Sequence, residues 1–174
     1  MAEPTRQTGD GAPAGVETFV RFTDVQKTYD GETLVVKNLN LDIKKGEFLT
    51  LLGPSGSGKT TTLLMIAGFE VPTHGDIVLA GQSLKHLPPH KRDIGMVFQS
   101  YALFPHMNVA ANVAFPLRLR GVARDEAARR VDQALEMVQL AGYGDRRVDQ
   151  LSGGQRQRVA LARAIVFEPR ILLM

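Results

Sequence analysis

The stretch GPSGSGKT, residues 53–60, decides how the rest of the chain is interpreted. It fits the pattern G-x-x-x-x-G-K-[ST] of a phosphate-binding loop, and it stands between an apolar, strand-like segment at residues 48–52 and a predicted helix over residues 58–67. Three glycines permit a tight loop whose backbone N–H groups point at phosphate oxygens, and the helix adds its positive N-terminal end. A glycine-rich turn with a solvent-exposed lysine is the alternative, but the strand–loop–helix context favours a phosphate site.

Composition limits the classes of protein to consider. The chain has 174 residues, of which 44% are apolar and 22% charged, as in ordinary globular domains. The net charge of +3 permits nucleic-acid binding without indicating it, because Lys and Arg are spread along the chain. Without cysteine there is no disulfide or thiolate metal site. No apolar run approaches the roughly 18 residues of a membrane helix, so we expect a cytosolic protein that reaches a membrane only through a partner.

The first half of the chain reads as an arm followed by strands. Residues 1–15 are rich in Gly, Pro, Ala and Thr and are expected to form a disordered arm. Alternating apolar residues from 17 to 43 predict half-buried antiparallel strands. The run 48–52 predicts a central strand covered on both faces, 75–81 predicts an edge strand, and 94–98 predicts another buried strand.

Past residue 98 the apolar period changes from two to about 3.6, which predicts helices. In the segment 123–140, five apolar residues share one face of an amphipathic helix that Gly142 and Gly144 are expected to end. Ser152 is expected to cap a second helix, which Pro169 breaks before the apolar run 171–174. The five apolar residues of the first helix are Ala127, Val131, Ala134, Leu135 and Val138.

A second glycine motif, LSGGQ, opens that last helix. Its two glycines let another molecule approach the backbone closely at a positive helix end, which makes it a candidate anion site. A capped helix with a flexible lead-in is the better explanation of the motif taken alone, but the phosphate loop upstream reverses that preference. Its residues are Leu151, Ser152, Gly153, Gly154 and Gln155.

The combination of motifs in this order resembles the nucleotide-binding subunits of ABC transporters, over residues 17–174. GPSGSGKT resembles the Walker A loop of that family, LSGGQ its signature motif, and Gln99 its Q-loop glutamine. The resemblance implies a P-loop NTPase-type α/β cassette with a mostly parallel core sheet, an antiparallel β subdomain and a helical insert at about residues 100–152. The residues it assigns to ATP are Tyr29, Gly53, Pro54, Ser55, Gly56, Ser57, Gly58, Lys59, Thr60 and Thr61.

The resemblance also implies roles for these residues. Lys59 would contact the β- and γ-phosphates, Thr60 and Gln99 would ligate Mg²⁺, and Tyr29 would stack on adenine. Two cassettes would meet head to tail, so that Ser152 and its neighbours in one subunit complete the ATP site of the other. Lys59, Gln99 and Ser152 are therefore the expected catalytic residues, with ATP and Mg²⁺ as cofactors and a second copy of the chain as a partner.

The segment around Gln99, HLPPHKRDIGMVFQSYALFPHM, resembles importers, and spermidine/putrescine importers most closely. This implies membrane permease subunits as direct partners, an extracytoplasmic substrate-binding protein as an indirect one, and a place on the cytoplasmic face of the membrane. Import of another solute, such as a sugar, iron or sulfate, remains open. A non-transport ABC protein of DNA repair is the distant alternative, but we expect no nucleic-acid partner because the span between the two motifs is short and lacks cysteine.

The final run, ILLM, resembles the Walker B strand, after which the family has an Asp near Mg²⁺ and a Glu that polarises water. Neither can be assigned to a residue of this chain. We therefore expect a C-terminally incomplete cassette that holds nucleotide and does not hydrolyse it.

Overall fold

The computed structural model describes residues 4–6 and 18–174. The chain divides into two compact units, the first ending at Arg92 and the second running from Asp93 to Met174. Of the expected disordered arm, only Pro4–Arg6 is described, as the short strand β1, and the remaining residues of the arm lie outside the described ranges.

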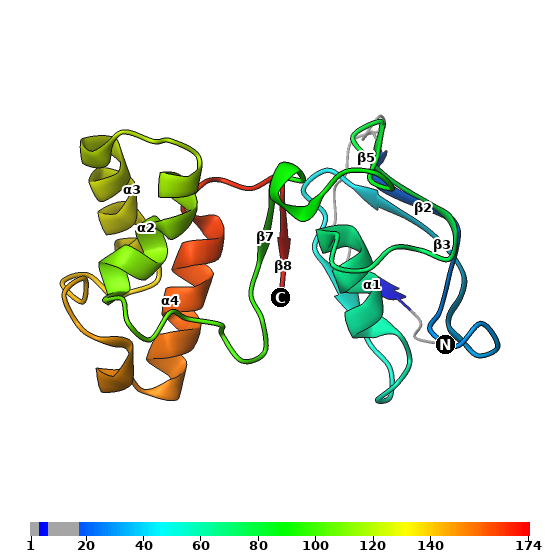
Figure 1. Cartoon of the computed structure of the whole chain (residues 1–174), viewed down its shortest axis with the longest axis horizontal. Helices are drawn as coiled ribbons and strands as arrows, with labels where there is room; N and C mark the ends of the chain where they lie inside the picture. Colours follow the sequence, from blue (N-terminus) through cyan, green and yellow to red (C-terminus); the bar gives the residue numbers. More distant parts are fainter. Residues whose placement is uncertain (1–3, 7–17) are drawn as a thin grey trace. The chain divides into compact units, whose positions relative to one another are not determined.

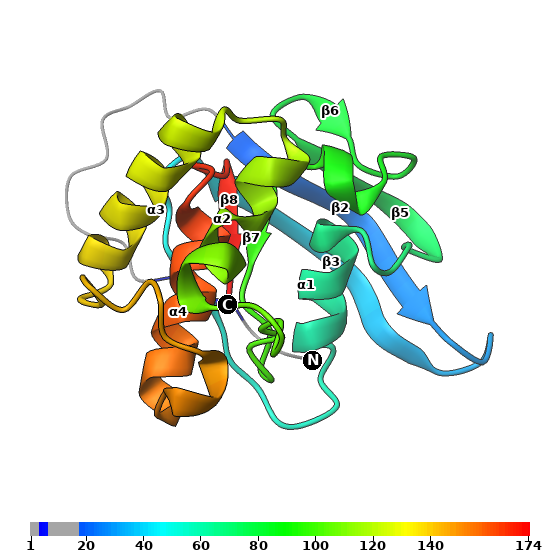
Figure 2. The same cartoon turned by 60° about the vertical axis from the view of Figure 1, so that its left-hand side comes forward.

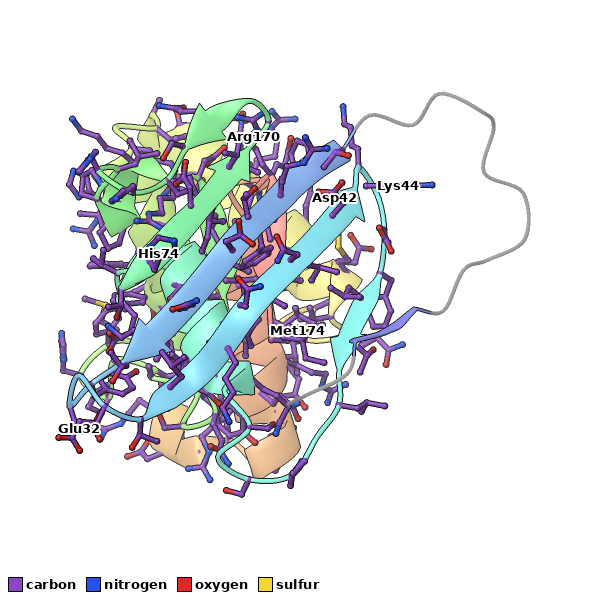
Figure 3. The ribbon with its side chains drawn as sticks, turned by 90° about the vertical axis from the view of Figure 1, so that its right-hand side faces the viewer. Glu32, Asp42, Lys44, His74, Arg170 and Met174 are labelled. Carbon is purple, nitrogen blue, oxygen red and sulfur yellow. The ribbon has the colours of Figure 1, made fainter. Side chains whose placement is uncertain are left out.

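The first unit is built on an antiparallel sheet in the order β3-β2-β5-β6. Its strands are β2 (Thr18–Thr28), β3 (Leu34–Lys44), β5 (His74–Leu79) and β6 (Gln82–Ser83). Figure 3 shows this sheet, with Glu32 in the hairpin before β3 and Asp42 near the other end of that strand. Val20 and Phe22 of β2 are buried, as the period of two predicts, whereas Val25 is buried out of phase because the register of β2 shifts between Phe22 and Val25.

Strand β5 is not the edge strand that the sequence predicts. It lies between β2 and β6, because the two-residue turn Ala80-Gly81 folds β6 back onto its end. Both turn residues have positive φ, 46° at Ala80 and 82° at Gly81, which is the backbone of a tight hairpin whose twist matches that of its strands.

Strand β4 (Leu49–Leu51) precedes the glycine loop and pairs antiparallel with β1. The prediction of a strand covered on both faces is wrong for this segment. Phe48 is 64% exposed and Leu52 54% exposed, and all three residues of β4 are only half-buried. A continuous run of apolar residues predicts that a strand forms. It does not predict whether both faces of the strand are buried, because that depends on which other segments pack against it.

Helix α1 (Lys59–Ala67) follows the loop and lies alongside β3, as Figure 2 shows. It buries Thr62, Met65, Ile66 and Ala67 and ends at Gly68, whose φ is 88°. After the 3₁₀ turn η1 (Pro89–Lys91), the guanidinium of Arg92 donates hydrogen bonds to the carbonyl oxygens of Met65 and Ile66, both at 2.8 Å. The side chain that ends the first unit thus holds the C-terminal end of α1.

The second unit combines a parallel strand pair with three helices (Figure 1). Strands β7 (Ile94–Met96) and β8 (Ile171–Leu173) pair in parallel, and they are the part of the expected parallel sheet found among residues 93–174. The helices are α2 (Val109–Leu119), α3 (Arg124–Met137) and α4 (Gly153–Ile165), with the 3₁₀ turn η2 (Val148–Gln150) before the last.

The three helices share one apolar core. The face predicted for α3 is buried throughout, and it meets Val113 of α2 and Val159 and Ala162 of α4. The core therefore includes α4 together with the segment 100–152 that the sequence assigns to a helical insert. Within the described part of the chain, no helix has the length and apolarity needed to cross a membrane.

The end of α3 differs from the prediction. The helix ends at Met137, and Gln139 takes φ 59° immediately afterwards, five residues before Gly144. The N–H of Leu140 donates to the carbonyl of Leu135, which satisfies one of the last helical acceptors. Glutamine occupies the left-handed position that glycine usually fills, so the sequence gives no glycine signal there.

Candidate nucleotide-binding site

The ammonium group of Lys59 is held by its own loop. Nζ donates to the carbonyl oxygens of Gly53 and Pro54, each at 2.7 Å, and to Oγ of Ser57 at 3.1 Å. All three acceptors are neutral, so the positive charge of Lys59 is hydrogen-bonded without being compensated by a carboxylate. An anion that enters the loop would meet a lysine already fixed in place.

The loop passes into α1 at Gly58, which is buried and has φ 86°. A Cβ atom at this position would lie 2.7 Å from the carbonyl oxygen of Val35 on β3. Only glycine fits, because both the positive φ and the neighbouring strand exclude a side chain. The same residue caps α1 without a side-chain hydrogen bond, so the first N–H groups of the helix have no side-chain cap at Gly58 competing for them.

The residues after Lys59 differ in exposure. Thr60 is exposed and Thr61 is half-buried, whereas Thr62 is buried and donates from Oγ1 to the carbonyl of Gly58 at 2.9 Å. Thr60 is thus the first-turn hydroxyl available as a ligand for a hard cation. No group of three or more His, Asp or Glu side chains that could hold a metal occurs in the described residues.

A cavity of about 520 Å³ lies beside the loop on the side of β3. It is lined by Leu34 to Leu41, by Leu51, and by the loop residues Gly56 to Lys59 together with Thr62. The cavity borders the glycine loop, but Tyr29 is not part of its lining.

Tyr29 follows β2 and is 60% exposed. Nζ of Lys27 lies 4.8 Å from the centre of its ring, and the same ammonium pairs with Glu70 at 2.8 Å. A ring with a cation on one face and solvent elsewhere can accept a stacked base on its other face. Stacking on adenine stays a prediction.

The signature residues form the start of α4. Ser152 accepts a hydrogen bond from the N–H of Gln155 at 3.2 Å, and Oε1 of Gln155 accepts from the N–H of Ser152 at 2.8 Å. This reciprocal capping box confirms the predicted helix start. Gly153 and Gly154 are exposed and a Cβ at either would meet nothing within 4 Å, so their backbone can be approached closely.

Gln99 is exposed in the segment between β7 and α2. That segment contacts α4 at Arg163, and Arg163 lies 11 residues after Ser152, or about 16 Å along the helix axis. Gln99 and the signature residues are therefore associated with opposite ends of α4, and one unit does not bring them together.

Sequence reasoning missed two arginines. Arg92 is 5% exposed and donates four hydrogen bonds, to the carbonyls of Met65, Ile66, Leu84 and Leu87. Arg163 donates to the carbonyls of Tyr101 and Ala102. Arg163 lies four residues after Val159 and three after Ala160, both buried, and this helical spacing was the available signal.

Comparisons with known proteins show the family of the chain. The family model described as ABC transporter matches residues 36–174. A spermidine/putrescine import ATP-binding protein of Rubrobacter xylanophilus is 56% identical over 160 residues, covering 92% of this chain and 42% of that protein. The corresponding protein of Acetivibrio thermocellus is 55% identical over 155 residues, covering 89% and 44%. An Fe(3+) ions import ATP-binding protein of Pasteurella multocida is 53% identical, again covering 89% and 44%.

The chain thus spans less than half the length of these curated relatives. Among solved structures, a dimeric ATP-binding cassette in a post-hydrolysis state with ADP and phosphate bound matches with a TM-score of 0.77 and 37% identity, over 88% of this chain and 72% of that one. A dimeric bacterial ABC transporter cassette matches with a TM-score of 0.79 and 36% identity, over the same shares. The glycine loop, the capped LSGGQ helix and these matches together show that the chain belongs to the ABC transporter family, as an ATPase cassette.

Proposed function

We propose that the chain binds ATP at residues 53–61 and is the nucleotide-binding part of an ATPase that drives solute import through a membrane permease. The observation that carries the proposal is Lys59, whose ammonium is fixed inside a glycine loop at the N-terminal end of α1 with neutral acceptors only. Negative phosphate oxygens are stronger acceptors than carbonyl oxygens, so they can replace one of these bonds with a net gain.

Thr60 would hold Mg²⁺ through its exposed hydroxyl, and Gln99 would contact the same ion as part of the proposed catalytic set. The ion, when bound, neutralises charge on the transferred phosphate. The protein's own contribution is position: Gly58 fixes where α1 begins, and that sets the place of both Lys59 and Thr60.

A head-to-tail homodimer is the proposed working state. The exposed backbone at Gly153 and Gly154 and the cap at Ser152 form a site for an anion that another subunit presents. Support comes from the dimeric form of both solved cassettes that match the chain. Membrane permease subunits and, through them, a substrate-binding protein are the other proposed partners, which would place the cassette on the cytoplasmic face of the membrane.

Polyamine import is the proposed transport activity, because spermidine/putrescine import proteins are among the most similar relatives. Iron import is the second candidate, favoured by the relative from Pasteurella multocida. Replacing Lys59 with Ala in the organism that carries the gene should abolish uptake of labelled spermidine and putrescine and leave Fe³⁺ uptake intact. The reverse pattern would support iron as the cargo.

Nucleotide binding is tested on the chain itself. A charge-assisted hydrogen bond is worth about 1.5–3 kcal/mol, so Lys59→Ala should weaken binding of a fluorescent ATP analogue roughly tenfold to hundredfold. Lys45→Ala is the matched control, since it removes the same charge from an exposed position outside the loop. Equal affinity of both variants would contradict the proposed site.

Hydrolysis by the 174-residue chain is expected to be absent. Phosphoryl transfer requires a carboxylate that supports the metal and a group that orients water, and the proposed catalytic set of Lys59, Gln99 and Ser152 contains no carboxylate. Phosphate release in Mg²⁺ and ATP should equal that of Lys59→Ala. Turnover above that level would show that residues of this chain supply the missing groups.

A further inference from the structure

The guanidinium of Arg163 in α4 hydrogen-bonds to the backbone of the segment 99–107, which begins with Gln99. Its Nη2 donates to the carbonyl oxygen of Tyr101 and its Nη1 to that of Ala102, both at 2.8 Å. Cζ of the same guanidinium lies 5.4 Å from the centre of the Phe104 ring. Partial burial lowers the pKa of Arg163 from its ordinary value, and arginine keeps its charge under all physiological conditions.

The two residues whose carbonyl groups Arg163 contacts have an energetically unfavourable backbone conformation. Tyr101 has φ 64° and Ala102 φ 47°, so two consecutive residues with side chains are left-handed. Such residues persist only where the surroundings hold them. The N–H of Tyr101 donates to the carbonyl of Phe98 at 2.8 Å, which closes a turn around Gln99 and Ser100. The guanidinium of Arg163 donates a hydrogen bond to each of the two carbonyl oxygens, of Tyr101 and Ala102, that this conformation turns towards α4.

The rest of the segment is fixed from α2. Asn112 is fully buried, and its side chain accepts from the N–H of Phe104 at 2.8 Å and donates to the carbonyl of the same residue at 3.1 Å. On the other side of Gln99, the N–H of Val97 donates to the carbonyl of Leu173 at 2.9 Å. Gln99 therefore stands between two anchored points, Val97 and Tyr101, and among the hydrogen bonds of the described residues it is Arg163 that ties the second of them to α4.

We infer that Arg163 is a positioning residue that fastens the segment 99–107 to α4, so that Gln99 takes its place from the helix whose opposite end carries Ser152. A displacement of α4 at the end that carries Ser152 is then transmitted to the turn around Gln99 through the two hydrogen bonds of the planar Arg163 guanidinium. The consequence for nucleotide sensing rests on the proposed function, whereas the fastening itself does not.

The absence of cysteine from the sequence makes a direct test possible. Spin labels on Ser100→Cys and Gln157→Cys, both exposed, report the separation between the Gln99 turn and α4 within the second unit. In the otherwise unchanged chain we expect a single narrow distance distribution. Arg163→Ala should broaden it at least twofold, while Arg156→Ala, which removes an exposed arginine of the same helix, should leave it unchanged.

Arg163→Lys keeps the charge but cannot reach two carbonyls in one plane, so it should give an intermediate width. It also decides the question if Arg163→Ala does not fold. A merely stabilising side chain would lower the unfolding midpoint and leave the distance distribution of the folded chain as it was. A wild-type width in Arg163→Lys, or in folded Arg163→Ala, would overturn the inference.

The two proposals fail separately. Lys59→Ala should bind the fluorescent ATP analogue more weakly, by the factor given above, and keep the narrow distance distribution, because the contacts of Lys59 lie in the first unit. Without Mg²⁺, the ion through which Gln99 is proposed to act, Arg163→Ala should bind the analogue with wild-type affinity and lose the narrow distance distribution. If both variants bind the analogue with wild-type affinity, the proposed nucleotide site is wrong and the inference about Arg163 is unaffected. If both variants keep the narrow distance distribution, the inference about Arg163 is wrong and the nucleotide site is unaffected.

Discussion

Gly68 and Arg92 fit against each other so closely that a Cβ atom added at Gly68 would lie 2.5 Å from Nε of Arg92. Gly68 also has φ 88°, and its N–H donates to the carbonyl of Leu64 at the end of α1. Gly68→Ala should therefore cost both the left-handed conformation and the displacement of a buried guanidinium. We expect a loss of about 2–4 kcal/mol in the free energy of unfolding, measured by urea denaturation.

Gly142→Ala provides the control for that experiment. Gly142 has φ 76°, and a Cβ there would meet nothing within 4 Å. The substitution should show the cost of the backbone conformation alone, about 1–2 kcal/mol. Equal losses in the two variants would mean that Arg92 moves aside without penalty.

Arg92 itself should be among the most sensitive positions of the first unit. Its four hydrogen bonds all go to backbone carbonyls, two of them at the end of α1, and no carboxylate is among these partners. Arg92→Met keeps the volume and leaves these buried acceptors without their donor, so we expect a loss of at least about 3 kcal/mol. Urea midpoints report it.

Arg21→Ala is the comparison, because the exposed pair between Arg21 and Asp42 at 2.8 Å should contribute far less. A similar midpoint for the two variants would mean that water satisfies the carbonyls that Arg92 leaves.

A single substitution in the turn between β5 and β6 should increase the stability of the fold. Its turn has positive φ at both central residues, and Asn-Gly suits that backbone better than the Ala80-Gly81 present. Ala80→Asn should raise the free energy of unfolding by about 0.5–1 kcal/mol, whereas Ala80→Val should lower it, since a β-branched side chain is poorly tolerated at positive φ. Thermal melts of the three proteins would reveal the order, and a more stable valine variant would exclude this turn type.

Asp30 fixes the hairpin between β2 and β3. Backbone hydrogen bonds from Thr33 and Glu32, and one from the hydroxyl of Thr28, hold the pKa of its carboxyl well below the ordinary value. Because the folded-state pKa is lower than the unfolded one, the ionised form favours the hairpin. That contribution is complete above about pH 4 and declines as the pH falls through the folded-state value.

The measurement is the carbon resonance of the Asp30 carboxyl followed through an acid titration. It should still be moving at a pH where a free aspartate has finished titrating. Asp30→Asn should make hairpin order independent of pH in this range, and an ordinary aspartate titration for Asp30 would contradict the geometry.

Much of the local structure follows from short-range patterns. Alternation places β2 and β3, the 3.6-residue period places α3, and Ser152 with Gln155 marks the start of α4, because each signal lies within the element it predicts. The glycine loop is equally local, since Gly58 needs its positive φ for the turn into α1.

What the sequence does not reveal depends on contacts between distant segments. Arg163 meets Tyr101 from 62 positions away, and Arg92 meets Met65 from 27 positions away. An arginine in either place reads as a surface charge until the fold brings carbonyl oxygens to it. The left-handed residues Gln139 and Ala102 are missed for the same reason, because tertiary contacts and not residue type set their backbone.

Arg92, whose side chain lies at the C-terminal end of α1, also changes the balance of charge between the two ends of that helix. Helix α1 has no acidic residue in its first turn and no basic residue in its last, so its own sequence offsets neither end of its dipole. Arg92 brings a positive charge to the carbonyls of Met65 and Ile66 and cancels the negative end. What remains is an unopposed positive potential at the start of the helix, where Lys59 stands. Arg92, a residue far along the chain, thus strengthens the preference for negative charge that the glycine loop already has from Lys59.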